Sequence, residues 1–81
     1  MNVEGLKSFL AVAKENSISK AARSLHLSQP ALSTRLQKME EGLGFPLVER
    51  NWDGIKLTKQ GFYFLPYAVQ MLQEMNSAST V

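Results

Sequence analysis

Apolar residues recur at helical spacing in three successive segments, and this repetition constrains the fold more than any other feature of the chain. A spacing of i, i+3, i+4 and i+7 places side chains on one face of a helix. The three apolar stripes are Leu6, Phe9, Leu10 and Ala13; Ile18, Ala21, Ala22 and Leu25; and Leu32, Leu36, Met39 and Leu43. We expect a helix at about residues 3–15, a short second helix, and a third at about residues 29–42.

Capping residues stand where these helices should begin and end. Ser17 or Ser19 can accept a hydrogen bond from an early backbone N–H of the second helix. Ser28 can do the same for the third helix, and Pro30 follows in the first turn, where a missing N–H has no cost. Gly42 and Gly44 supply the stop signal of the third helix.

The remainder of the chain predicts a hairpin and one long helix. Residues 45–50 and 55–57 have the pattern of short strands, and the Asp53–Gly54 pair between them favours a tight turn, so we expect a hairpin at about residues 48–57. Thr58 is placed to cap a last helix from Lys59 to about Met75, followed by a frayed tail from Ser77. This divides the chain into a domain of residues 1–58 and a linker helix with its tail, residues 59–81.

Composition excludes several functional classes. The chain of 81 residues has no cysteine and one histidine, which excludes disulfides, thiol nucleophiles and histidine clusters. His26 lies near Ser28, but no acid is placed to orient it, so we expect no catalytic site, no metal and no cofactor. No segment has the ~18 apolar residues of a membrane span. We expect a soluble, cytoplasmic protein that is not an enzyme.

The third helix has an unusual polar face. Between Ser17 and Met39 the chain carries four cations and no carboxylate. The residues opposite the apolar stripe, on its shoulders and in the first turn are Pro30, Thr34, Gln37, Lys38, Glu41, Ser33, Arg35 and Gln29. Glutamine can pair with base edges, hydroxyl groups can meet phosphates, and a helix N-terminus attracts phosphate. A short alanine-containing helix, a turn and this helix together form a helix-turn-helix, which predicts insertion into the major groove.

Two less specific interpretations stay open. Any exposed helix face is polar, and a helix-turn-helix domain of this kind can also serve as a protein–protein interaction module. The missing carboxylates favour DNA, because a protein-binding face has no reason to exclude them.

Five segments, in order, resemble one known family. They are Ser-Phe-Leu-Ala-Val-Ala from Ser8, Ser-Ile-Ser-Lys-Ala-Ala from Ser17, Leu-Ser-Gln-Pro-Ala-Leu-Ser from Leu27, Leu-Gly-Phe-Pro-Leu-Val-Glu-Arg from Leu43, and Leu-Thr-Lys-Gln-Gly from Leu57. They resemble the N-terminal winged helix-turn-helix domain of LysR-type transcriptional regulators. The resemblance implies a mainly α fold with a three-helix core, a two-stranded β wing and a long C-terminal linker helix.

The same resemblance implies sequence-specific binding of double-stranded DNA by a homodimer, with the wing over the minor groove. A small-molecule effector would act only through a C-terminal domain absent from this chain. Thr34 and Arg35 depart from the family's usual arginine and glutamine. The expected DNA-binding residues are Ser28, Gln29, Pro30, Ser33, Thr34, Arg35, Gln37, Lys38, Arg23, Lys20, Arg50 and Lys56.

The wing also departs from the family, whose members often carry arginine near the hairpin tip. This chain has Trp52 and Asp53 there, so we expect a weak minor-groove contact. Trp52 packs either on the DNA sugars or against its own domain, and the sequence leaves both interpretations open.

The last helix is expected to form the dimer. Its apolar residues make an arc about 180° wide, whereas packing on one small domain needs only about 100°. A second subunit would cover the excess, and Pro66 predicts a bend between Phe62 and Pro66. The expected dimerisation residues are Phe62, Phe64, Leu65, Ala68, Val69, Met71, Leu72 and Met75.

Overall fold

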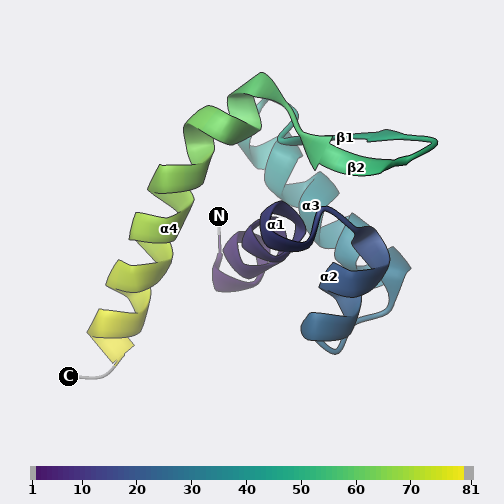
Figure 1. Ribbon diagram of the computed structural model, residues 1–81. Helices are drawn as coiled ribbons and strands as arrows, with labels where there is room; N and C mark the ends of the chain where they lie inside the picture. Colours follow the sequence, from purple (N-terminus) through teal and green to yellow (C-terminus); the bar gives the residue numbers. More distant parts are fainter. Residues whose placement is uncertain (1, 80–81) are drawn as a thin grey trace.

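The computed structural model describes residues 2–79 and confirms a mainly α winged helix-turn-helix (Figure 1). Three helices form the core: α1 (Val3–Glu15), α2 (Ile18–Ser24) and α3 (Gln29–Leu43). A hairpin of β1 (Val48–Asn51) and β2 (Gly54–Leu57) follows, and α4 (Lys59–Ser79) ends the described chain. Figure 1 shows the hairpin and α4 leaving the core in different directions.

Each core helix begins at a capping side chain. Asn2 accepts a hydrogen bond from the backbone N–H of Gly5 at 2.8 Å. Ser17, rather than Ser19, caps α2, and Ser28 caps α3 as predicted. These caps satisfy backbone donors that a helix leaves unpaired in its first turn.

The turn between α2 and α3 is closed by His26, which has a left-handed backbone with φ of 58°. The backbone N–H of Leu27 bonds to the carbonyl of Ala22 at 2.9 Å, and that of His26 bonds to the carbonyl of Arg23 at 3.2 Å. This pair of bonds is the Schellman arrangement that ends a helix. The only histidine of the chain therefore serves as a helix terminator.

The core is built from the predicted apolar faces of the three helices, closed by the hairpin and α4. Ala21 and Ala22 are buried, and their small side chains let α2 approach α1 and α3 closely. Phe9 on α1 packs against Phe64 on α4 with ring centroids 5.7 Å apart. The buried apolar residues are Leu6, Phe9, Val12, Ala21, Ala22, Leu32, Leu36, Met39, Leu47, Ile55, Leu57 and Ala68.

The hairpin pairs its strands antiparallel, with Val48 opposite Leu57 and Asn51 opposite Gly54. The prediction that the first strand begins at Phe45 was wrong by three residues. Residues 45–47 stand outside the ladder because side chains take up two of their backbone groups: the N–H of Leu47 donates to the Glu40 carboxylate at 2.6 Å, and the carbonyl of Pro46 accepts from the Thr58 hydroxyl at 2.7 Å.

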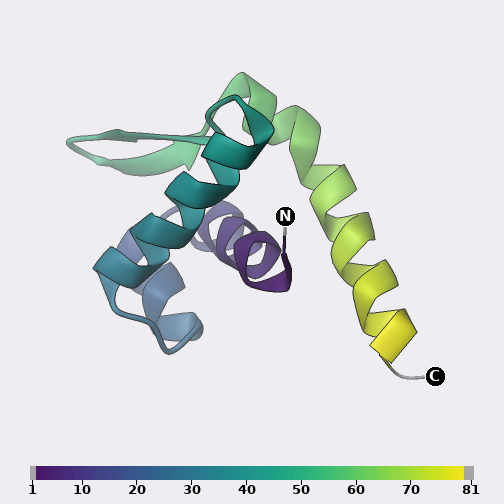
Figure 2. The same cartoon turned by 180° about the vertical axis from the view of Figure 1, so that it is seen from behind.

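Helix α4 runs for 21 residues, beyond the predicted end at Met75. The prediction of a frayed tail from Ser77 was wrong as far as Ser79, because no glycine or proline stops the helix there. Thr80 and Val81 lie outside the described residues. Figures 1 and 2 show α4 changing direction in its first turns, where a bend was predicted from Pro66.

The start of α4 lies directly on the loop before the hairpin. Thr58 caps the helix by accepting a hydrogen bond from the Gly61 N–H at 2.9 Å. A Cβ atom added at Gly61 would overlap the carbonyl oxygen of Leu47. Glycine is therefore needed at this position for space, although its backbone is helical.

Candidate nucleic-acid interface

The N-terminal half of α3 presents the predicted polar face to solvent. Gln29, Pro30 and Thr34 are exposed, as are Gln37, Lys38 and Glu41 further along, whereas Ser33 and Arg35 are half-buried on the shoulders. Figures 1 and 2 show the N-terminal end of α3 and the tip of the hairpin on the same side of the molecule. One surface thus combines the start of α3 with the hairpin.

Two side chains join the hairpin to α3 and fix its position. One carboxylate oxygen of Glu40 accepts hydrogen bonds from the backbone N–H groups of Leu47 at 2.6 Å and Val48 at 3.1 Å. Nearer the hairpin tip, Nη2 of Arg50 donates to the hydroxyl of Ser33 at 2.7 Å. Sequence reasoning missed these positioning bonds, because neither spacing nor composition distinguishes Glu40 from Glu41.

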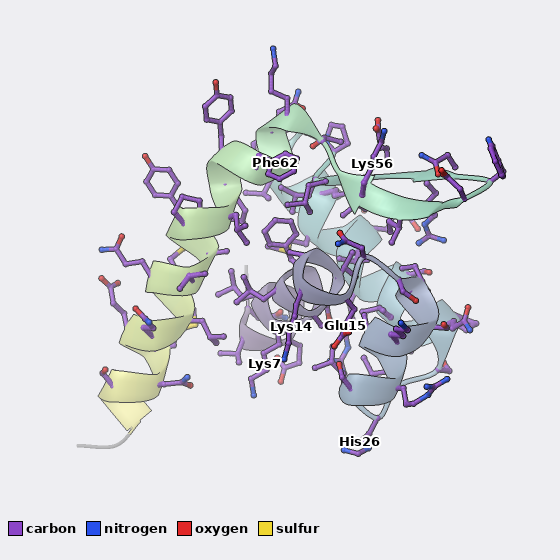
Figure 3. The ribbon with its side chains drawn as sticks, viewed as in Figure 1. Lys7, Lys14, Glu15, His26, Lys56 and Phe62 are labelled. Atoms are coloured by element: carbon purple, nitrogen blue, oxygen red, sulfur yellow. The ribbon has the colours of Figure 1, made fainter. Side chains whose placement is uncertain are left out.

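The cations expected from the sequence lie in different environments. Lys20 and Arg23 are exposed on α2. Lys56 pairs with Glu49 at 3.5 Å, and Figure 3 shows it on the side of the hairpin turned away from the helices. Both partners are more than half exposed, so the pair is screened by water and contributes little to stability.

Carboxylates absent from residues 17–39 of the sequence approach this surface from other segments. A groove of about 380 Å³ is lined by Gln29, Arg50 and Asp53, among other residues. A second groove, of about 420 Å³, is lined by Arg35 and Lys38 together with Glu4 from α1. The surface without carboxylates is thus smaller than the acid-free segment of the sequence, because Asp53 lies near Gln29 and Glu4 lies near Arg35 and Lys38.

Trp52 is 96 % exposed at the turn of the hairpin. The indole ring does not pack against its own domain, so this structure rules out one of the two interpretations left open by the sequence. A partner that covers apolar surface of this ring would gain about 25 cal/mol of binding free energy for each Å² removed from water.

The apolar arc of α4 is divided between the core and solvent. Ala68 is buried, and Phe64, Leu65 and Met71 pack against the core of their own subunit. Leu72 is half-buried. Of the residues expected to form the dimer, three are classed as exposed: Phe62, Val69 and Met75.

Two tyrosines that the sequence analysis did not select extend this exposed side of α4. Tyr63 is 73 % exposed and Tyr67 is 63 % exposed. Helical spacing alone gave them no weight, because they lie outside the two stripes that were counted. We define the exposed side of α4 by its large exposed apolar residues, which are Phe62, Tyr63, Tyr67, Val69 and Met75.

The described residues contain no arrangement suited to catalysis or to metal binding. Figure 3 shows His26 pointing outward from the turn between α2 and α3. No group of three or more His, Cys, Asp or Glu side chains within residues 2–79 could hold a metal ion. A search of the same residues finds no helix with the length and apolar character of a membrane span.

Comparison with known proteins gives a consistent result. Residues 3–62 match the model of the bacterial regulatory helix-turn-helix proteins of the lysR family. The HTH-type transcriptional regulator BenM from Acinetobacter baylyi is 40% identical over 76 residues, which cover 94% of this chain and 25% of BenM. The chain thus spans about a quarter of the length of this curated relative.

Solved structures agree with the sequence match. The crystal structure of a CbnR DBD–DNA complex superimposes with a TM-score of 0.93 at 38% identity, covering 99% of this chain and 92% of the other. A complex of the BenM DBD with catB site 1 DNA gives a TM-score of 0.89 at 38% identity, covering 99% of this chain and 90% of the other. The chain therefore belongs to the lysR family of bacterial regulatory helix-turn-helix proteins, a family of transcriptional regulators and not of enzymes.

Proposed function

We propose that this chain binds double-stranded DNA in a sequence-specific manner, with α3 in the major groove and the hairpin beside the minor groove. The observation that carries the proposal is the exposed start of α3, where Gln29, Pro30 and Thr34, none of them acidic, face solvent next to the hairpin. The CbnR and BenM domains that this chain resembles were crystallised with DNA, which supports the proposal.

The exposed residues of α3 divide by chemistry into base and phosphate contacts. Gln29 and Gln37 carry amides that can bond both donor and acceptor groups on a base edge. Thr34 can place its methyl group against a thymine methyl. The hydroxyl of Ser28 caps the helix by accepting from the Ala31 N–H at 3.2 Å, and its O–H can still donate to a phosphate.

Cations around α3 would meet the phosphate backbone. Lys20 and Arg23 are exposed on α2 and have no hydrogen-bond or ion-pair partner among the described side chains. Arg50 already donates to Ser33 and can reach a phosphate with its remaining donors. Such contacts release counterions, so affinity should fall steeply as salt rises.

We further propose that two copies pair through the exposed side of α4. The large exposed residues of this side are apolar, its one carboxylate is Glu74, seven residues after Tyr67, and no Lys or Arg follows Lys59 in the chain. Tyrosine and phenylalanine are common at the centres of protein interfaces because they bury large areas with little loss of conformational entropy. A two-fold dimer would present two α3 helices to successive major grooves, which requires half-sites about one helical turn apart.

A small-molecule effector would act through residues outside this chain, because the chain spans only about a quarter of BenM. In a bacterium the chromosomal DNA lies in the cytoplasm. A chain that binds this DNA has to be there as well, so we propose a cytoplasmic location.

Selection of duplexes from a random-sequence pool, followed by a mobility-shift assay at low salt, tests this function. We expect a selected site with approximate two-fold symmetry and an affinity that falls steeply between ~50 and ~200 mM salt. Failure to retain any duplex at low salt would contradict DNA binding and favour a protein-interaction module. A selected site without two-fold symmetry would contradict only the proposal that two copies pair through α4.

A further inference from the structure

Charge cannot account for a contact between the hairpin tip and DNA. The side chains of Glu49, Arg50, Asp53 and Lys56 sum to no net charge across the hairpin. Lys56 is paired with Glu49, and Arg50 is bonded to Ser33 near α3 rather than at the tip. The tip itself carries the amide of Asn51, the carboxylate of Asp53 and the indole ring of Trp52. The indole is the only large apolar group among them.

The position of the indole is set by the bonds that hold the hairpin. The carboxylate of Glu40 holds the backbone at the start of β1. Near the end of β1, the side chain of Arg50 is bonded to Ser33 on α3. The hairpin tip projects on the same side as the start of α3 (Figure 2). A duplex seated on the start of α3 therefore passes the tip, and Trp52, which is 96 % exposed, is the largest apolar group available to it.

We propose that Trp52 is an uncharged DNA contact, whose indole packs against the sugars that line the minor groove beside the site read by α3. This inference rests on the proposed DNA-binding function. The flat ring covers the apolar faces of deoxyribose, and its N–H can donate to the adenine N3 and thymine O2 acceptors of the groove floor.

This chemistry has a measurable signature that separates it from a phosphate contact. Replacing a cation that touches phosphate lowers the slope of log K against log salt by about 0.9. Replacing Trp52 should weaken binding at every salt concentration and leave that slope unchanged, because the indole displaces no counterion. Trp52 is also the only tryptophan in the chain, so its emission reports on this one position.

The test titrates the wild-type chain, Trp52→Ala and Trp52→Phe with a duplex selected from a random pool. We expect Trp52→Ala to bind about tenfold more weakly, equivalent to about 1.4 kcal/mol, with an unchanged salt slope. We expect Trp52→Phe to stay within about threefold of wild type. The wild-type emission should shift and be quenched as the duplex is added.

Three results would overturn the inference. The first is a duplex that shifts in mobility without changing the emission of Trp52. The second is Trp52→Ala binding as tightly as wild type. The third is an emission change that depends on protein concentration without DNA, since this would place the indole against a second copy of the chain. In all three cases the duplex can still bind through α3, so the proposed function is judged separately, by whether any duplex is retained.

Discussion

Glu40 makes the sharpest prediction about stability, because one carboxylate holds the hairpin against α3. Its oxygen accepts two backbone N–H groups, at 2.6 Å and 3.1 Å, and Glu40→Ala removes both bonds at once. A hydrogen bond to a charged group contributes about 1.5–3 kcal/mol. Because Glu40 is only half-buried and water can replace part of the loss, we expect the free energy of unfolding to fall by about 2–4 kcal/mol.

Thermal unfolding measures this effect directly. For a domain of this size 1 kcal/mol corresponds to about 4–8 °C, so a loss of about 2–4 kcal/mol in Glu40→Ala should lower Tm by about 8–32 °C. Glu41→Ala is the matched control, since it makes the same change in charge at an exposed neighbouring position. It should change the free energy of unfolding by no more than about 0.5 kcal/mol.

Glu40→Gln keeps the shape of the side chain and removes its charge, so it measures how much of the stabilisation depends on the charge. The amide oxygen can still accept a backbone hydrogen bond but lacks the strength given by a full charge, so its Tm should lie between those of wild type and Glu40→Ala. Equal melting temperatures for Glu40→Ala and Glu41→Ala would refute the reasoning, because the hairpin would then be held by apolar packing alone.

Three further predictions concern separate parts of the molecule. Gly61→Ala should lower the free energy of unfolding by about 1–3 kcal/mol, because its Cβ overlaps a backbone carbonyl. Gly42→Ala has open space around it and should raise the free energy of unfolding by up to about 1 kcal/mol. Changes of the same sign for both variants in chemical denaturation would contradict this. Lys20→Gln should lower the slope of log K against log salt by about 0.9 in duplex titrations. If Lys7→Gln on α1 lowers the slope equally, the effect comes from total charge and not from a phosphate contact of Lys20. Tyr67→Ser should raise the dimer Kd about tenfold in sedimentation equilibrium, and an unchanged Kd would move the dimer contact away from this side of α4.

Local patterns predicted most of the elements. The bounds of α1, the short α2, the caps Ser17 and Ser28 and the span of the hairpin all follow from spacing and turn residues. These signals are local, since a cap or a periodic stripe depends on residues within a few positions of one another. For the same reason the end of α4 was missed: the chain carries no stop signal there, and composition alone suggested a tail.

Tertiary contacts account for what the sequence did not predict. Glu40 bonds to backbone groups seven and eight residues away, and Gly61 is required by the carbonyl of Leu47, which only the folded chain brings near. The apolar arc of α4 could not be divided from the sequence, because spacing does not tell which side faces the core. Exposure places Ala68 inside and Tyr67 outside.

The central claim is that DNA lies against the start of α3, and one carboxylate placed there tests it most directly. Thr34 is exposed, and glutamate is a better helix former than threonine, so Thr34→Glu should fold as wild type does by circular dichroism. A new carboxylate facing DNA costs at least about 2 kcal/mol, so binding of a selected duplex should weaken at least about 30-fold. Lys7→Gln, with the same change in net charge on α1, should stay within about twofold of wild type. Thr34→Glu binding as tightly as wild type would contradict the account.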